Sequence, residues 1–176
     1  MQRVVVVGVT GVGKTTFASA LSERLGLPHI ELDSLYWQPH WTPCDPDDFR
    51  ARIVAEVARN GWVIDGNYSA TRDLVWSSAD TLIWLNYPLP LVLDRLVRRT
   101  LRRGIRREIL WGSNQERLWT QFFSSDSLFL WLLKRYPHYR REYPRILRQP
   151  EFAHLRVIQF HSPVQASEWL ARVSPS

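Results

Sequence analysis

The chain contains 176 residues, of which 45% are hydrophobic, and carries a formal net charge of +6. This length and composition exclude a largely disordered chain and indicate one domain, residues 1–176, with room for a buried core. The lack of a long apolar run argues against a membrane span, and a single cysteine rules out an internal disulfide and suits a reducing, cytoplasmic compartment.

The first element that the sequence predicts is a strand over residues 3–7, a valine run typical of a strand buried on both faces. Residues 8–15 then match the pattern G-x-x-x-x-G-K-[ST], which wraps the phosphates of a nucleoside triphosphate. Residues 16–25 carry apolar side chains at helical spacing, and Gly26 is placed to end that helix. Strand, loop and helix follow in the order that a phosphate-binding loop requires, so a glycine-rich turn without a ligand is the weaker alternative.

Each residue type in this loop has a physical task. The glycines permit sharp turns that expose main-chain N–H groups, which form a cradle for anions together with the N-terminus of the helix. Lys14 is expected to reach the β- and γ-phosphates, and the hydroxyl of Thr15 is expected to ligate Mg²⁺. The residues expected to bind the nucleotide are Gly8, Thr10, Gly11, Val12, Gly13, Lys14, Thr15 and Thr16.

Further strands alternate with helices along the rest of the chain. Short apolar runs predict strands over residues 28–32, 62–65, 81–85 and 155–160. Helices are predicted from Pro46 to before Asn60, over 70–76, from Pro88 or Pro90 to Arg103, from a capping box at 113–116 through Tyr136, and over 138–148 and 163–172. Between these elements, residues 34–45 are expected to form a substrate-side loop, and Gly104 to end its helix before a short lid at 104–112.

This alternation predicts an α/β fold of three layers, with a five-stranded parallel sheet between two layers of helices. Ligands of such sheets bind outside the carboxyl ends of the strands. The rule selects the residues that ring the expected site: Gly8–Thr15, Asp33, Asp65–Asn67, Asn86–Tyr87 and His161–Pro163.

With these motifs in place, the chain resembles the adenylate-kinase-like P-loop kinases and, more narrowly, the bacterial DNA topology modulation proteins. The segments that carry the resemblance are His29–Trp37, Gly61–Ser69, Ala79–Leu85 and Arg95–Arg103. The resemblance implies a nucleotide-kinase-like P-loop fold that uses ATP and Mg²⁺. Adenylate kinases carry Asp-Gly-Phe-Pro-Arg after the third strand, whereas this chain has Asn67-Tyr68 after Asp65-Gly66, which counts against adenylate as the acceptor.

Two carboxylates are candidates for the chemistry. In kinases that resemble this fold, an acid at the position of Asp33 orients the acceptor hydroxyl or holds Mg²⁺ through water, and an acid at the position of Asp65 also binds Mg²⁺ through water. The alternatives are structural: Asp33 caps a helix before Ser34, or Asp65 caps the turn at Gly66-Asn67.

The acceptor side is expected to hold a second group of residues. Asn67 and Tyr68 are expected to line the acceptor pocket, and Arg72, one helical turn further on, to clamp an anion. Trp37, in a proline-rich loop that is hard to bury, is a candidate to stack on the acceptor.

The arginines around Gly104 form the second strong signal. Guanidinium groups stabilise the charge that phosphoryl transfer moves onto oxygen atoms. Arg99, Arg103 and Arg107 are the candidates to close over the nucleotide, and several of their arginine neighbours are expected to be solvated surface.

The sequence therefore predicts an ATP- and Mg²⁺-dependent kinase whose acceptor is a nucleotide, a nucleoside or a small hydroxyl compound. The alternative is a nucleotide-binding regulator associated with DNA, because residues 94–148 carry a net charge of +9 and the remainder of the chain −3. A phosphate-facing lid with solvated helices is the favoured explanation of that charge, and no membrane partner is expected. The chain lacks an Asn-Lys-x-Asp motif, so guanine specificity is not expected.

Overall fold

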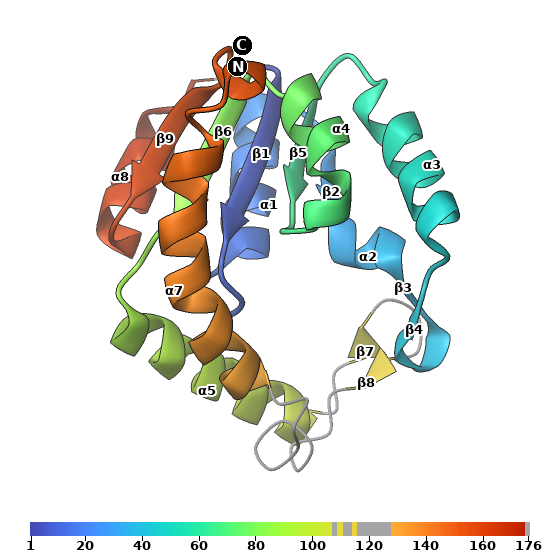
Figure 1. The fold of residues 1–176 in the computed structure, drawn as a ribbon. Helices are drawn as coiled ribbons and strands as arrows, with labels where there is room; N and C mark the ends of the chain where they lie inside the picture. Colours follow the sequence, from blue (N-terminus) through green and yellow to red (C-terminus); the bar gives the residue numbers. More distant parts are fainter. Residues whose placement is uncertain (107–108, 111–113, 116–127, 175–176) are drawn as a thin grey trace.

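The computed structural model describes residues 1–106, 109–110, 114–115 and 128–174. Its centre is a parallel sheet of five strands in the order β2-β5-β1-β6-β9 (Figure 1). The strands are β1 (Arg3–Gly8), β2 (His29–Glu31), β5 (Trp62–Asp65), β6 (Thr81–Leu85) and β9 (Arg156–Phe160). The five strands expected from the sequence and the α/β fold class are confirmed.

The valines of β1 form the middle of the core. Val5 lies opposite Ile64 of β5 on one side and opposite Leu82 of β6 on the other, and all three side chains are fully buried. Because β2 and β5 lie on one side of β1 and β6 and β9 on the other, the loop after β1 starts where the strand order reverses. Ligands of open α/β sheets bind at such a point.

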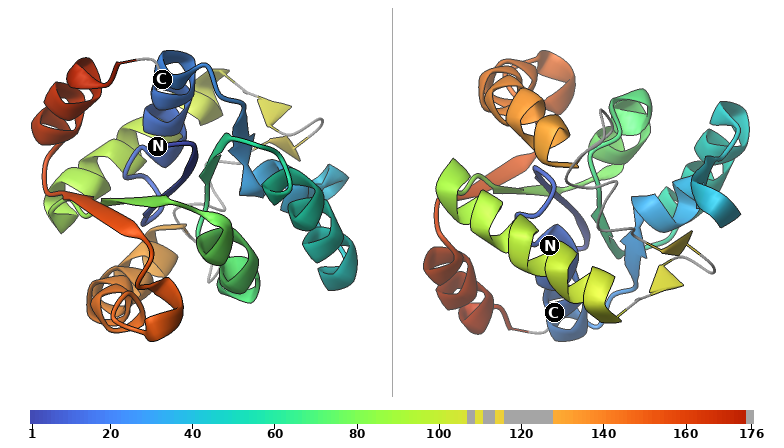
Figure 2. Two further views of the ribbon diagram at one scale, coloured as in Figure 1. Left: turned by 90° about the horizontal axis from the view of Figure 1, so that it is seen from above. Right: turned by 90° about the horizontal axis from the view of Figure 1, so that it is seen from below.

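Helices cover both faces of the sheet (Figure 2). One face carries α1 (Lys14–Leu25) and α8 (Pro163–Arg172), which meet where the ring of Phe17 stacks on that of Trp169 with centroids 6.2 Å apart. The other face carries α4 (Arg72–Ser78) and α7 (Leu128–Ile146), where Trp76 and Tyr143 meet edge to face at 5.5 Å. The long helix α5 (Leu89–Arg106) crosses below the carboxyl ends of the strands (Figure 2).

The chain between β2 and β5 forms a separate cluster of short elements beyond the sheet edge (Figure 1). In order these are α2 (Leu32–Tyr36), β3 (Trp37–Gln38), the 3-10 turn η1 (Pro39–Trp41), β4 (Thr42–Pro43) and α3 (Pro46–Val57). As the sequence predicts, Asp45 caps α3 by accepting hydrogen bonds from the main-chain N–H groups of Asp47 and Asp48. A small hairpin of β7 (Ile109–Leu110) and β8 (Asn114–Gln115) lies beside η1 (Figure 1). Two further 3-10 turns, η2 (Ser69–Thr71) and η3 (Pro150–Phe152), precede α4 and β9.

Two boundaries before the lid differ from the sequence prediction. The second strand ends at Glu31, and Leu32 already begins α2. The reason is a tertiary contact between Leu32 and Gly66. The side chain of Leu32 packs so closely over Gly66 that a Cβ added to this glycine would lie 2.7 Å from the Cβ of Leu32. Gly104 does not end α5, which continues to Arg106, because a glycine costs a helix only about 1 kcal/mol relative to alanine.

Two boundaries after Gly104 also differ. Asn114 and Gln115, expected to cap a helix, pair in β8 instead, while part of the expected lid and residues 116–127 lie outside the described residues. From Leu128 a single helix, α7, runs through Pro137, where two helical pieces were expected. A proline inside a helix costs about 3 kcal/mol, and the buried side chains of Leu132, Tyr139 and Tyr143 on the same helix offset that cost.

Candidate functional site

The phosphate-binding loop has the backbone that its glycines were expected to allow. Gly8, Gly11 and Gly13 have φ angles of +153°, +78° and +102°, values that side-chain-bearing residues rarely adopt. A Cβ at Gly8 would lie 2.7 Å from the carbonyl oxygen of Leu85, so β6 also excludes any larger residue there. Gly13 is followed directly by α1, whose first N–H groups therefore face the loop.

Thr15 and Asp65 meet at the start of α1. The Thr15 hydroxyl donates a hydrogen bond of 2.7 Å to Oδ2 of Asp65, the last residue of β5. The other carboxylate oxygen lies 3.4 Å from Nε2 of His29, which the sequence analysis did not single out. Mg²⁺ in proteins is held by a few oxygen ligands together with water and substrate phosphates, so the Thr15 hydroxyl and the Asp65 carboxylate fit the metal expected beside a nucleotide.

Lys14 lies between opposing charges. Its ammonium group donates a hydrogen bond of 3.3 Å to the carbonyl oxygen of Val9, on the other side of the phosphate loop. Burial lowers the pKa of Lys14, the carboxylates of Asp65 and Asp33 act in the opposite direction, and the charge of Arg99 lowers it further. Both predicted carboxylates and one predicted arginine therefore lie near enough to Lys14 for their charges to act on it.

Asp33 does not lie at the end of a strand, as the sequence analysis expected, but within α2. Its carboxylate accepts a hydrogen bond of 2.6 Å from the hydroxyl of Tyr68. The structural alternative fails as well, because Glu31 is the capping residue of α2 and Ser34 donates to the Glu31 carbonyl. Burial and the neighbouring Asp33 charge raise the pKa of Tyr68, so the phenol stays protonated and holds the carboxylate as a donor.

Asn67 braces the phosphate loop rather than offering its amide to an acceptor. Its Oδ1 accepts a hydrogen bond of 3.2 Å from the main-chain N–H of Gly8, and its Nδ2 donates to the Gly8 carbonyl oxygen. Both polar atoms of the side chain are thus engaged by one glycine. No feature of the sequence marks this pairing, since the two residues are 59 positions apart.

Aromatic rings gather beside Asp33. The ring of Tyr36 lies 4.8 Å from that of Tyr68 and 4.9 Å from that of Trp37, and Trp37 in turn meets Trp41 at 5.6 Å. Trp41 has a φ of +57°, a left-handed backbone that is unusual for a bulky residue. The predicted acceptor-side residue Trp37 therefore belongs to a row of rings in tilted and edge-to-face contact that begins at the Asp33–Tyr68 pair.

The arginines of α5 separate into distinct roles. Arg95 donates a hydrogen bond of 2.9 Å to the carbonyl oxygen of Val12 in the phosphate loop, and its guanidinium lies 5.5 Å from the centre of the Tyr87 ring. Arg98 is exposed and pairs with Asp94. Arg99 acts electrostatically on Lys14, whereas the side chain of Arg103 and the whole of Arg107 lie outside the described residues.

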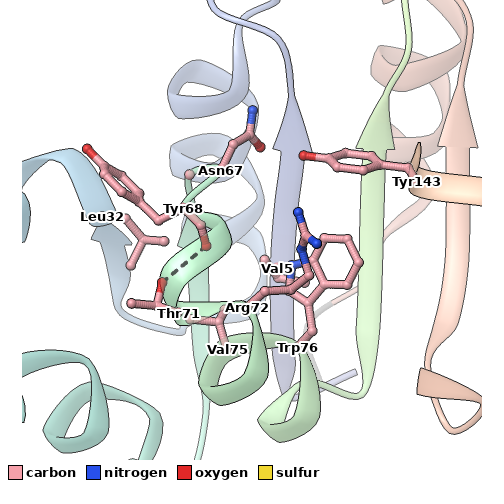
Figure 3. Close-up of a pocket in the computed structure, with 10 residues that line it drawn as sticks. Val5, Leu32, Asn67, Tyr68, Thr71, Arg72, Val75, Trp76 and Tyr143 are labelled. Atoms are coloured by element: carbon pink, nitrogen blue, oxygen red, sulfur yellow. Dashed lines mark hydrogen bonds between the residues drawn. The ribbon is translucent and has the colours of Figure 1, made fainter. Parts of the chain in front are cut away.

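Arg72 lines a small recess between α4 and α7 (Figure 3). Its guanidinium carbon lies 5.0 Å from the centre of the Trp76 ring. Asn67, Tyr68, Thr71 and Tyr143 contribute the other polar side chains of the recess. Arg72, Asn67 and Tyr68, expected together on the acceptor side, lie in one recess. Tyr143, from the far end of α7, also lines it, and no pattern in the sequence marks that residue.

Thr10 and Thr16 were also predicted to bind the nucleotide. Thr10 is in the loop itself, and Thr16 is exposed in the first turn of α1.

None of the helices within residues 1–106 and 128–174 combines the length and apolar composition that crossing a bilayer requires.

Comparisons with solved structures support the fold. Shikimate kinase from Bacteroides thetaiotaomicron superposes with a TM-score of 0.57 over 97% of this chain and 95% of that one, at 15% identity. A gluconokinase from Sinorhizobium meliloti 1021 gives 0.54 over 97% and 92%, at 21% identity. Shikimate kinase from Acinetobacter baumannii, solved with shikimate, gives 0.54 over 98% and 90%, at 19% identity. The chain therefore has the fold of P-loop kinases of the shikimate kinase and gluconokinase type.

Sequence comparisons add little. No family model matches the chain. The uncharacterized protein YqaC of Bacillus subtilis (strain 168) is 28% identical over 96 residues, which is 53% of this chain and 54% of that protein. The chain thus spans about half the length of this curated relative, and the resemblance to DNA topology modulation proteins stays a prediction.

Proposed function

We propose that the protein is an ATP- and Mg²⁺-dependent kinase that phosphorylates a small hydroxyl-bearing molecule. The observation that carries the proposal is the geometry of the phosphate loop: the ammonium of Lys14 donates to the Val9 carbonyl oxygen across the loop, and Thr15, the next residue, is hydrogen-bonded to Asp65. The shikimate kinases and the gluconokinase that share the fold are named for hydroxyl-bearing substrates, which favours such an acceptor over a nucleotide.

The nucleotide side of the site follows from the phosphate loop. The glycine turns and the start of α1 offer main-chain N–H groups to the phosphates of ATP, and Lys14 adds a positive charge. Thr15, and Asp65 through water, would hold Mg²⁺, which supplies charge neutralisation at the phosphate oxygens. Arg99, whose charge acts on Lys14, would stabilise the charge on the group in transfer.

The acceptor side follows from Asp33. Its carboxylate orients the acceptor hydroxyl and takes its proton, while the hydroxyl of Tyr68 fixes the position of that carboxylate. The acceptor oxygen then bonds to the γ-phosphorus, and the bond from that phosphorus to the bridging oxygen breaks. The products are ADP and a phosphorylated acceptor, and the proton passes from Asp33 to solvent.

The test is an assay of ADP release with Mg-ATP and a panel of hydroxy acids, sugars, nucleosides and nucleoside monophosphates. Lys14→Ala should remove most turnover, because the phosphates lose their cation. Asp33→Asn should keep its affinity for Mg-ATP in calorimetry while turnover falls about a hundredfold or more, the range for losing a positioned proton acceptor. Asp47→Asn, at an exposed site in α3, is the matched control and should behave as the parent protein.

Two results would overturn the proposal. A parent protein that gives no heat with Mg-ATP would not be a kinase of this kind. Unchanged transfer by Asp33→Asn would remove Asp33 from the mechanism while leaving nucleotide binding intact.

A second candidate function is a nucleotide-binding regulator associated with DNA, without transfer to a small molecule. The net charge of +9 in residues 94–148 is the observation that favours it. Kinase turnover with any member of the acceptor panel would separate the two candidates.

A further inference from the structure

His29 brings the edge strand β2 into contact with the proposed metal site. In the register of the two strands, His29 of β2 lies opposite Val63 of β5, and Glu31 lies opposite Asp65. Alternate residues of a strand point to the same face of a sheet, so His29 and Asp65 share a face and are diagonal neighbours. The imidazole nitrogen Nε2 of His29 accordingly lies 3.4 Å from Oδ1 of Asp65.

The nitrogen of His29 that faces Asp65 is buried without an ordinary hydrogen bond. The side chain is 16% exposed, but Nε2 itself is buried, so the exposed part of the ring lies away from that atom. The residue also lines an open cavity of about 300 Å³ between β2 and the end of α3, where water can reach the rest of the ring. Within the described part of the chain, Nε2 has no hydrogen bond of good geometry, whereas buried polar atoms normally have partners. A movement of roughly half an ångström toward Oδ1 would form one.

Asp65 needs a donor on that second oxygen. Its carboxylate is 3% exposed, and the Thr15 hydroxyl already donates to Oδ2. The charge of Asp65 acts on Lys14 more strongly than that of Asp33 does, yet the ammonium donates to the Val9 carbonyl oxygen. A direct pair between Lys14 and Asp65 would withdraw the ammonium from the phosphates and the carboxylate from the metal. A donor on Oδ1 opposes that pairing, because it holds the carboxylate against Thr15.

We propose that His29 is a positioning residue, which donates from Nε2 to Oδ1 of Asp65 and so fixes the carboxylate that holds Mg²⁺ through water. A carboxylate oxygen only accepts hydrogen bonds, so Nε2 carries the proton of the neutral ring. A neutral donor suits this position, because a lysine or an arginine would cancel the charge that the metal needs. The inference rests on the proposed function for the metal, but not for the contact between His29 and Asp65.

The first experiment tests this contact without metal or nucleotide. The ¹⁵N-labelled protein is studied by long-range ¹H–¹⁵N spectroscopy at about pH 8, where an ordinary imidazole is neutral. The signals of His29 are assigned by their absence from the spectrum of the His29→Gln variant. His29 should be the tautomer with its proton on Nε2. A proton on Nδ1 instead would place a lone pair opposite the carboxylate of Asp65 and overturn the proposal.

The second experiment measures how nucleotide binding depends on Mg²⁺. Calorimetry with a non-hydrolysable ATP analogue gives the affinity in EDTA and the Mg²⁺ concentration at half-maximal enhancement. His29→Phe keeps a ring but loses the nitrogen, and it should need about tenfold more Mg²⁺ while its affinity in EDTA equals that of the parent. His29→Gln, whose amide nitrogen can take the place of Nε2, should restore the Mg²⁺ dependence. His154→Phe, at an exposed histidine before β9, is the matched control and should behave as the parent.

Three results would overturn the role of His29 toward the metal. The His29→Phe protein could need no more Mg²⁺ than the His154→Phe protein, or lose equal affinity with and without Mg²⁺, as a purely structural role predicts. The His29→Gln protein could also be as impaired as His29→Phe. If His29→Phe does not fold by circular dichroism, His29→Asn, whose amide is too short to reach Asp65, takes its place. A parent protein that binds no ATP analogue would overturn the proposed function, while the tautomer of His29 would still test its contact with Asp65.

Discussion

At Gly8 the chain leaves β1 with a φ of +153°, and a Cβ there would lie 2.7 Å from the Leu85 carbonyl oxygen. That oxygen belongs to the backbone of β6 and cannot rotate away. Gly8→Ala should therefore lower the free energy of unfolding by ~3 kcal/mol or more and weaken Mg-ATP binding, because strain and a steric clash combine. Urea denaturation and calorimetry measure the two effects.

Gly26→Ala is the matched control for this change. Gly26 also has a positive φ, +65°, but no atom lies within 4 Å of the position that a Cβ would take. Only the left-handed backbone is penalised there, at about 1 kcal/mol. Equal losses in the two variants would mean that contact with Leu85 does not restrict the loop.

Contacts through Arg95 of α5 link the phosphate loop to α7. Arg95 holds the Val12 carbonyl and lies over the Tyr87 ring, and the Tyr87 carbonyl accepts a hydrogen bond of 3.1 Å from Tyr136 of α7. Arg95→Gln should weaken Mg-ATP binding about tenfold, because a hydrogen bond from a charged group to the loop is lost. Arg98→Gln, three residues on and exposed, should bind Mg-ATP as the parent does. Similar affinities of the two variants in calorimetry would contradict a bracing role for Arg95.

The elements that the sequence predicts well are those whose pattern is local. Buried runs such as Val4–Val7 predict strands, and the glycine spacing of residues 8–15 predicts the phosphate loop. Prediction from the sequence fails where a contact between residues far apart in the chain determines where an element begins or ends. Strand β2 ends early because Leu32 packs on Gly66, and α7 passes Pro137 because its buried face docks on the sheet.

The same distinction applies to the candidate site. Lys14, Thr15 and Asp65 could be selected because a motif or a strand end marks each position. Asp33 was selected as the residue after a predicted strand, although that strand ends at Glu31. The contacts that these and neighbouring residues make could not be predicted. Tyr68 reaches Asp33 across 35 positions and Arg95 reaches Val12 across 83, and no local pattern encodes either distance.

For the molecule as a whole, Asp80 ties the beginning of β1 to the beginning of β6. Its Oδ2 accepts hydrogen bonds from the main-chain N–H groups of Gln2 and Arg3 at 2.7 and 2.8 Å, and its Oδ1 accepts one from the Thr81 hydroxyl at 2.6 Å. Burial alone would raise the pKa of Asp80, but the bonds from Thr81, Arg3 and Gln2 lower it below the ordinary value. A lowered pKa in the folded state stabilises the protein above the unfolded pKa, and that stabilisation is lost as the pH falls through the folded one.

Asp80→Asn should therefore lower the stability at pH 7 by ~1 kcal/mol, which corresponds to about 2–4 °C in melting temperature. The difference from the parent should shrink as the pH falls below about 3.9, where the aspartate of the unfolded chain is protonated. Glu168→Gln, on the exposed side of α8, controls for the change in net charge. A difference that stays constant between pH 7 and the acid range would show that the Asp80 charge does not stabilise the fold.

The uneven charge of the chain separates the two candidate functions. Residues 94–148 carry +9, and the exposed arginines Arg141 and Arg145 of α7 belong to that region without touching the phosphate loop. Arg140 is unsuitable for a test, because it donates a hydrogen bond of 2.6 Å to the Tyr136 hydroxyl.

We expect the double variant Arg141→Gln/Arg145→Gln to keep the Mg-ATP affinity and turnover of the parent. Any retention on DNA should be weak, fall steeply with salt and decrease in the variant, since each lost phosphate contact lowers the slope of log affinity against log salt by about one. Tight, sequence-dependent DNA binding at physiological salt that this variant abolishes, in a protein that phosphorylates no member of the acceptor panel, would favour the DNA-associated regulator over the kinase.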